Sequence, residues 1–122
     1  MHESGLFLND WKDADNQVLI EQFAIPAAEL QGIEILLASY CRDAFYGEAF
    51  VLFSRDGRLY EVNASHDSSD GMTGQWEPEE TLIEALRYRL ENGRLGSHED
   101  GCNLFADELR FLLFELEADG FR

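Results

Sequence analysis

The sequence is poor in basic residues. Only nine of its 122 residues are lysine or arginine, against 25 aspartates and glutamates, so the formal net charge at pH 7 is −16. A protein this acidic repels the phosphates of DNA, RNA and anionic membrane surfaces, which excludes these as direct partners. If the chain binds a macromolecule, we expect a basic protein surface, and such surfaces most often bind nucleic acid. The alternative is that the acidity serves solubility alone.

Long apolar runs and a cysteine-rich framework are also missing. No apolar stretch approaches the ~20 residues that span a membrane. The N-terminal MHESGLFLNDWKDAD lacks the basic start and long apolar core of a signal peptide. Cys41 and Cys102 could pair, but two lone cysteines in a cytosolic chain are more often buried reduced thiols. These absences predict a cytoplasmic protein.

The chain does contain enough apolar material for one core. Hydrophobic residues make up 45% of it, and its length fits a single domain over residues 1–122. The clearest element is AFVLFSRDGRLYEVNAS, in which two runs of β-forming residues flank Asp56-Gly57, the preferred pair for a type I′ hairpin turn. This turn predicts a core face that pairs Phe53 with Tyr60, Val51 with Val62 and Ala49 with Ala64. The other face, expected to be only partly covered, contains Phe50, Leu52, Leu59, Glu61 and Asn63.

Helical patterns surround this hairpin. Residues 13–25 predict a helix capped by Asp13 or Asp15, and residues 33–41 read as a strand. A helix is predicted over 78–93 with Pro78, Glu79 and Glu80 in its first turn and Gly93 at its end. Its apolar stripe would be Leu82, Ala85, Leu86 and Leu90. We therefore predict an α+β fold, a three-stranded antiparallel sheet with helices packed on one face, in the order α-β-β-β-α-α.

The last predicted helix, residues 103–118 with Asn103 as its cap, is unusually apolar. Phe111 and Phe114 fall beside its main stripe and widen it beyond what one core needs. They predict a homodimer through this helix, unless the core wraps the helix completely. The main stripe consists of Phe105, Leu109, Leu112, Leu113 and Leu116.

The stretch SHDSSDGMTGQWEPEE, residues 65–80, has five carboxylates and no basic residue. His66, Asp67 and Asp70 are possible ligands for a metal ion, although their spacing fits no standard site. The same residues are ordinary turn chemistry. We therefore expect no metal and no cofactor, and keep a small metal-dependent enzyme using these three residues as an alternative.

Trp76 lies between this acidic stretch and the predicted helix. Its ring could pack near Leu82 or Ile83 and fix the start of the helix, which is the interpretation we favour. Alternatively it is an aromatic anchor surrounded by carboxylates, as in binding hot spots. Both roles can hold together.

GEAFVLFSRDGRLYEVNASH, followed by GQWEPEETLIEALRYRL, resembles small acidic proteins encoded by phages and prophages. The resemblance covers about residues 33–95, and the run from Gln75 to Glu80 is its most distinctive part. In that family the loop after His66 usually carries cysteines where this chain has Asp67 and Ser69, so any thiol or metal chemistry of the loop is in doubt here. The resemblance implies a phage origin and an intracellular setting in a bacterial host, but no reaction.

The leading hypothesis is a non-enzymatic inhibitor that presents carboxylates from residues 1–34 and 66–81 to a basic surface. That surface would be the nucleic-acid-binding surface of a host defence protein, such as a CRISPR effector or a restriction enzyme. A further alternative is an immunity-like or assembly protein whose acidity only keeps it in solution. No catalytic residue is expected. The predicted partner-binding residues are Asp67, Asp70, Trp76, Glu77, Glu79 and Glu80.

Overall fold

The computed structural model describes residues 5–42, 46–66, 72–96 and 103–122. Three α-helices and a short 3₁₀ helix accompany five strands in this part of the chain. The strands are β1 (Leu6–Asn9), β2 (Glu34–Arg42), β3 (Gly47–Arg55), β4 (Arg58–His66) and β5 (Glu79–Thr81). The helices are α1 (Asn16–Phe23), η1 (Ala27–Leu30), α2 (Ile83–Glu91) and α3 (Ala106–Ala118).

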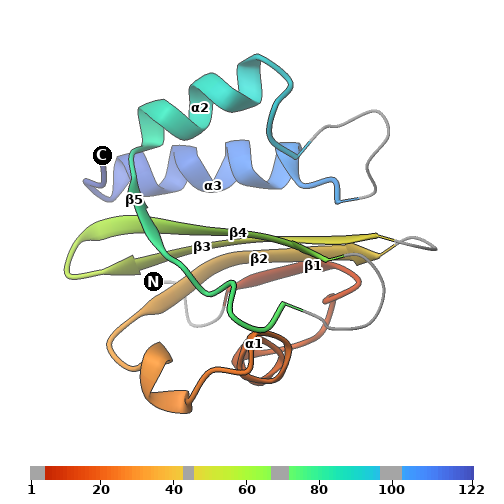
Figure 1. Cartoon of the computed structure of the whole chain (residues 1–122). Coiled ribbons are helices and arrows are strands. Elements are labelled where there is room, and N and C mark those ends of the chain that lie inside the picture. Colours follow the sequence, from red (N-terminus) through yellow and green to blue (C-terminus); the bar gives the residue numbers. More distant parts are fainter. Residues whose placement is uncertain (1–4, 43–45, 67–71, 97–102) are drawn as a thin grey trace.

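The strands form one mixed sheet in the order β1-β2-β3-β4-β5. β1 pairs with β2 in parallel, and all other neighbours are antiparallel. Helices α2 and α3 cover one face of the sheet, while α1 and η1 lie on the other (Figure 1). The predicted α+β class is therefore confirmed. The predicted purely antiparallel three-stranded sheet with helices on one face is wrong, because β1 and β5 were not foreseen and α1 packs opposite α2 and α3.

The hairpin of β3 and β4 has the predicted register. Asp56 and Gly57 both have positive φ, 53° and 80°, as a type I′ turn requires, and the pairs are Phe53–Tyr60, Val51–Val62 and Ala49–Ala64. This face packs against α1 as expected. The prediction that the opposite face is only partly covered is wrong for its apolar side chains. Its apolar side chains, Phe50, Leu52 and Leu59, are buried beneath α2 and α3.

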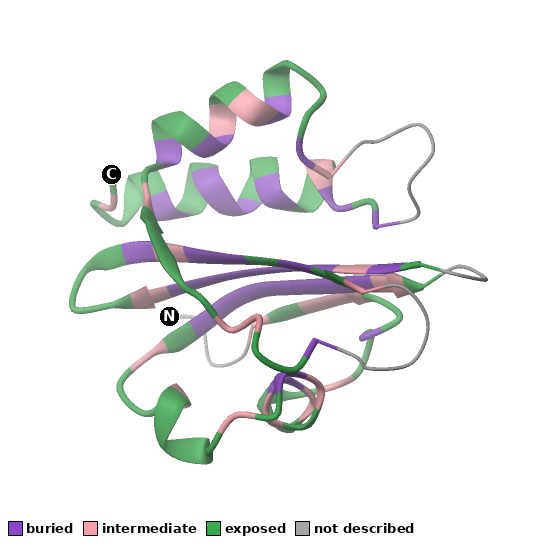
Figure 2. Ribbon diagram, in the orientation of Figure 1, coloured by how far each residue is buried: buried purple, intermediate pink, exposed green. Residues whose placement is uncertain are grey.

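Two hydrophobic cores therefore sandwich the sheet. One joins Leu37, Phe50 and Leu52 of the sheet to α2 and α3. The other joins the opposite face to Leu19 and Phe23 of α1 and includes Trp11, Met72 and the half-buried Trp76. Figure 2 shows buried residues along the sheet and on the sides of α2 and α3 that face it. Burial on both faces explains why β2 and β3 are nearly continuous apolar runs.

The first helix is shorter than predicted but starts where the sequence indicated. The side chain of Asp15 accepts a hydrogen bond from the backbone N–H of Gln17 at 3.0 Å and caps α1. Ala24, with φ of 54°, ends it in the left-handed conformation. Asp13 also has a positive φ, 69°, in the turn before the helix.

The predicted helix over residues 78–93 begins only at Ile83. Glu79–Thr81 instead forms β5, which pairs with Leu59–Glu61 of β4. The unpaired backbone groups of β4 outcompete the helix for these residues, so Glu79 and Glu80 do not lie in a first helical turn. The buried stripe shifts as well: Leu82 and Ala85 are exposed. The buried residues of α2 are Ile83, Leu86 and Leu90.

Asn103 does not cap the last helix. Asn103 is buried and contacts Ser39, which is 64 residues away in sequence. Its Oδ1 accepts a hydrogen bond from the Ser39 hydroxyl at 2.5 Å, and the Asn9 side chain donates to the same hydroxyl at 2.7 Å. The N-terminus of α3 is instead satisfied by the carbonyl of Gly96, which accepts from the N–H groups of Phe105 and Ala106. All five predicted stripe residues are buried, while Phe111 and Phe114 are 68% and 70% exposed.

No helix of the described segments is long and apolar enough to cross a membrane. Cys41 is disulfide-bonded, so the expectation of a reduced thiol is wrong at this residue. The sequence has one other cysteine, Cys102, which lies outside the described residues.

Candidate functional site

The run Gln75–Glu80 crosses the β5 edge of the sheet from the α1 side to the α2 side (Figure 1). Gln75 anchors its start. Its Oε1 accepts from the N–H of Ser65 at 2.9 Å, and its Nε2 donates to the carbonyl of Ser65 at 2.7 Å. The side chain therefore satisfies both backbone groups of one β4 residue, as a neighbouring strand would.

Trp76 does not pack against the start of α2, so the predicted contact with Leu82 or Ile83 is wrong. Its ring stacks on Phe53 of β3, with centroids 5.8 Å apart and planes at 12°, and meets the edge of Phe23 of α1 at 5.1 Å. The hairpin places Phe53 on the α1 face, which draws Trp76 to that side. Because the ring is half-buried, part of it stays accessible beside Glu77.

The predicted partner-binding carboxylates do not form one cluster. Glu77 is exposed next to Trp76. Glu79 is paired with Glu61 and Glu80 with Tyr60, and successive strand residues point to opposite faces. Glu79 therefore lies on the α2 side. Glu80 lies at the edge of the sheet, 3.8 Å from Arg58, and lines a pocket together with Arg122. Asp67 and Asp70 lie outside the described residues.

A larger acidic surface lies over α1. The N–H of Met72 donates to the carbonyl of Gln22 at 3.3 Å, and Trp76 meets Phe23, so residues 72–77 pack onto the N-terminal segment. This contact joins the two most acidic parts of the sequence. We call the exposed carboxylates of these segments on the α1 side the acidic face. It consists of Asp13, Asp15, Glu21, Glu29 and Glu77.

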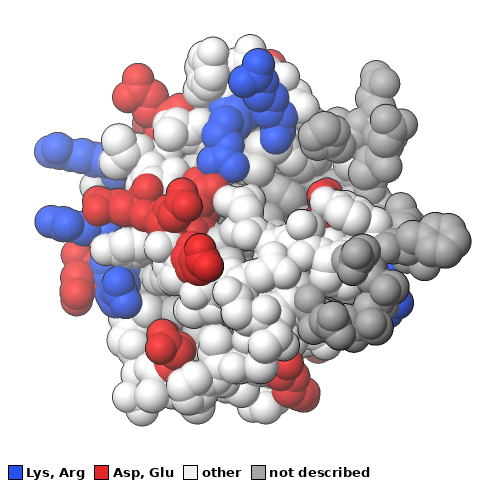
Figure 3. Space-filling view, viewed as in Figure 1, with Lys and Arg blue, Asp and Glu red and all other residues white. Residues whose placement is uncertain are grey.

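No carboxylate of the acidic face forms an ion pair with a basic residue of the described chain. Lys12 is the only basic residue in positions 1–34. In the view of Figure 3, acidic side chains lie over α1 and η1 and no basic side chain does. The acidic face therefore has an uncompensated negative charge.

The α2 and α3 side has a different balance of charge. Five of the nine basic residues belong to this side, namely Arg87, Arg89, Arg94, Arg110 and Arg122. Three of them pair with carboxylates: Arg87 with Glu117 at 3.2 Å, Arg110 with Asp107 at 3.2 Å, and Arg89 with Glu61 at 2.8 Å. Charge is thus distributed unevenly between the two faces of the sheet, as it is along the sequence.

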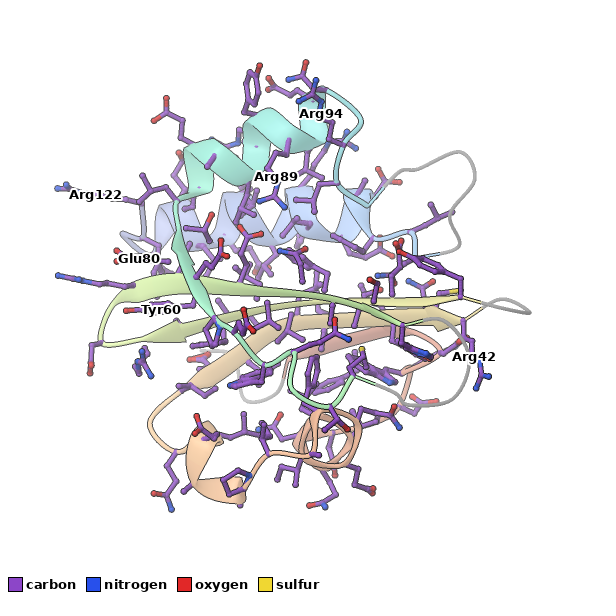
Figure 4. The ribbon with its side chains drawn as sticks, in the orientation of Figure 1. Arg42, Tyr60, Glu80, Arg89, Arg94 and Arg122 are labelled. Carbon is purple, nitrogen blue, oxygen red and sulfur yellow. The ribbon has the colours of Figure 1, made fainter. Side chains whose placement is uncertain are left out.

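Glu61 and Arg89 are the most buried of these ion pairs. Glu61 is only 6% exposed, and Nη1 of Arg89 lies 2.8 Å from both of its carboxylate oxygens. Asn63 donates to the same carboxylate at 2.7 Å. Arg89 reaches from α2 toward the sheet in Figure 4. The sequence predicted that Glu61 and Asn63 lie on a mixed, partly covered hairpin face, but it did not identify Arg89 as their partner.

His66, the one described member of the predicted metal set, packs against Tyr40. Its Nε2 lies 2.6 Å from the Tyr40 hydroxyl, and the two rings stack at 5.8 Å. Trp11 also stacks on Tyr40, with ring centroids 5.1 Å apart. Burial raises the pKa of Tyr40; of the nearby charges, Arg42 lowers it and Asp10 raises it. No group of three or more possible metal ligands occurs among the described residues, and Asp67 and Asp70 lie outside them.

Comparison with known proteins adds no family to this description: the chain matches no protein-family model, no curated protein and no solved structure.

Proposed function

We propose that the protein is a non-enzymatic binding protein whose acidic face docks on a basic protein surface. The observation that carries this proposal is the packing of residues 72–77 on α1, which adds Glu77 to the four exposed carboxylates of the N-terminal segment, none of them with a basic partner in the described chain. Unpaired like charges on one face repel one another and are retained at some cost in stability. Complementary charge on a partner would offset that repulsion and accelerate encounter.

The partner would be a host protein with a nucleic-acid-binding surface, and carboxylates would occupy the places of phosphates. The resemblance to phage-encoded proteins makes a defence protein, such as a CRISPR effector or a restriction enzyme, the natural candidate in a bacterial cytoplasm. Within the acidic face, Trp76 would supply apolar contact beside Glu77. Asp67 and Asp70, together with Glu80 at the sheet edge, would extend the negative surface. Glu79 lies on the other side of the sheet and is not part of the proposed contact.

The test neutralises the acidic face without changing the fold. Glu21, Glu29 and Glu77 are exposed and have no side-chain hydrogen bond or ion pair in the described chain, so a triple Glu→Gln variant removes charge alone. The wild-type protein is used to isolate a partner from host cells, and the affinity is then measured at several salt concentrations. We expect the triple variant to bind about tenfold more weakly and with a shallower salt dependence.

A matched control removes the same charge from the other side of the molecule. Glu84, Glu91 and Glu115 are exposed on α2 and α3 and are also unpaired in the described chain. Their triple Glu→Gln variant should keep wild-type affinity, and nucleic acid should compete with the wild-type protein for the partner. Equal weakening by both variants, or an affinity that salt does not change, would contradict the proposal.

A further inference from the structure

A polar cleft lies between the sheet and the end of α2, on the side opposite the acidic face. Along the strands, the face beneath α2 and α3 changes from apolar, with Leu52, to polar, with Asn63 and then Ser65. A cavity of about 330 Å³ opens over this polar end, near the lower limit of the ~300–1,000 Å³ usual for small-molecule sites. The residues that matter here are Glu48, Asn63, Ser65, Arg89, Arg94 and Asn103.

Two arginines form one wall of the cleft. The backbone N–H of Arg94 donates to the carbonyl of Arg89 at 2.9 Å, which fixes the two residues next to each other at the end of α2 (Figure 4). Glu61 neutralises Arg89 through a single guanidinium nitrogen, Nη1. Arg94 forms no ion pair with a carboxylate of the described chain. Arg94 is exposed, so its guanidinium is accessible to a ligand.

Glu48 contributes the opposite charge from β3. It is half-buried, and its carboxylate has neither an ion pair nor a hydrogen bond to the described residues. Glu48 and Arg94 line the same cavity but form no ion pair with each other. The cavity of about 330 Å³ is thus lined by one charge of each sign that has no protein partner in the described chain.

The groups around these two charges are polar and held in place. Asn103 is fixed by its bonds to Ser39, and Asn63 is oriented by its bond to Glu61. The remaining carbonyl oxygen of Asn63 and the hydroxyl of Ser65 make no hydrogen bond within the described chain, so both are free to contact a ligand. A preorganised polar wall of this kind lowers the entropic cost of binding.

We propose that this cleft binds a zwitterion of the size of a free amino acid or a dipeptide. The ligand carboxylate would lie against the guanidinium of Arg94, with Arg89 beside it, and the ligand ammonium would face Glu48. Asn63 and Ser65 would contact the polar groups between them. A simple anion satisfies only Arg94 and is repelled by Glu48, so the arrangement selects for both charges. This inference is independent of the acidic face.

The test is a titration of the ¹⁵N-labelled protein followed by NMR. The probes are the standard amino acids and glycylglycine, compared with inorganic phosphate and acetate as anions and methylammonium as a cation. We expect at least one zwitterion to shift the amide signals of Asn63, Ser65 and Gly96 saturably, and the single-charge probes to bind at least about tenfold more weakly. Tight binding of phosphate or acetate alone, or no saturable binding of any zwitterion, would overturn the proposal.

Two variants then assign the charges. Arg94→Gln and Glu48→Gln should each weaken the bound zwitterion by about tenfold or more. Their matched controls, Arg55→Gln at the hairpin end of β3 and Glu115→Gln on α3, should leave affinity unchanged. The dispersion of the amide signals reports whether each variant folds, and the wild-type titration decides between zwitterion and anion without any variant. Unchanged zwitterion affinity in both Arg94→Gln and Glu48→Gln would also contradict the proposal.

Discussion

The side chain of Gln75 binds both backbone groups of Ser65, accepting at 2.9 Å and donating at 2.7 Å. This pair explains how residues that look like a helix start become an edge strand. Once Gln75 is fixed beside β4 and Trp76 is packed on Phe53, the next residues run along the open edge of β4. The distinctive Gln-Trp-Glu-Pro-Glu-Glu run thus has a structural role as well as its proposed role in binding.

We expect Gln75→Ala to lower the free energy of unfolding by about 1–2 kcal/mol, because two hydrogen bonds are lost at a partly exposed position. Urea denaturation measures this change. Gln31→Ala is the control, since Gln31 is exposed and its side chain has no hydrogen bond in the described chain, and it should change stability by less than about 0.5 kcal/mol. Equal effects of the two substitutions would show that the Gln75 contact contributes nothing.

Removal of Arg89 should destabilise the protein more than removal of both members of its ion pair. Arg89→Met leaves the carboxylate of Glu61 buried with only Asn63 as a donor, at a cost of about 2 kcal/mol or more. Because the Arg89 side chain is 32% exposed, solvent reduces this cost below that of a fully buried pair. The double variant Glu61→Leu, Arg89→Met should recover most of the loss, and chemical denaturation of the full double-mutant cycle measures the coupling.

How much of the fold is predictable depends on how local its causes are. The β3–β4 register follows from Asp56-Gly57, two adjacent residues, and was predicted pair by pair. The strands β1 and β5 have four and three residues and exist only because a partner strand lies beside them. Local signals at Glu79 and Glu80 favoured a helix, and pairing with β4 prevailed. Asn103 resembles a helix cap in sequence, but its partners, Ser39 and Asn9, are distant in sequence.

The candidate sites were likewise predictable only where their causes are local in sequence. The sequence indicated that residues 1–34 and 66–81 are acidic, but not that Met72 and Gln22 join them. It grouped Glu79 with Glu80, whereas Glu79 lies beside Glu61 on the α2 side and Glu80 lies at the sheet edge near Arg58. The polar cleft is assembled from β3, β4 and the end of α2. The sequence analysis singled out neither Arg94 nor Glu48, and only the fold brings them to the same cavity.

Stability should fall at alkaline pH because of Tyr40. Its pKa in the folded state is raised, chiefly by burial, above the value of about 10 that an unfolded tyrosine has. The folded protein therefore binds more protons than the unfolded chain above that pH, and stability decreases as the pH rises through the folded pKa. Below about pH 10 the contribution is fully present. Denaturation from pH 8 to 11 should show this loss, and Tyr40→Phe should flatten it.

Reduction should lower the thermal stability of the protein because Cys41 is disulfide-bonded. Loss of a disulfide typically costs about 2–4 kcal/mol, and Cys41→Ser should have a similar effect that a reductant does not increase. Mass spectrometry after alkylation, with and without prior reduction, tells whether the thiol reacts. A Cys41 that is alkylated without reduction would contradict the prediction. This outcome would also favour the cytoplasmic setting, where thiols are kept reduced.

We expect the protein to self-associate through α3. Its buried side is already complete, with Leu109, Leu112, Leu113 and Leu116 against the core. Phe111 and Phe114 are one helical turn apart on the opposite side and largely exposed, and adjacent exposed aromatic side chains mark interaction surfaces more often than chance. We therefore expect two copies to pair through these residues about a two-fold axis, although the net charge opposes it, so moderate salt should favour the dimer.

Sedimentation or light scattering at micromolar concentration measures the mass. Phe111→Ser together with Phe114→Ser should yield a single chain with unchanged stability, because neither ring contributes to the core. Tyr88→Ser is the control, since Tyr88 is an exposed aromatic residue of α2, and it should leave the dimer intact. A mass of one chain for the wild-type protein would exclude the dimer and leave Phe111 and Phe114 available to another partner.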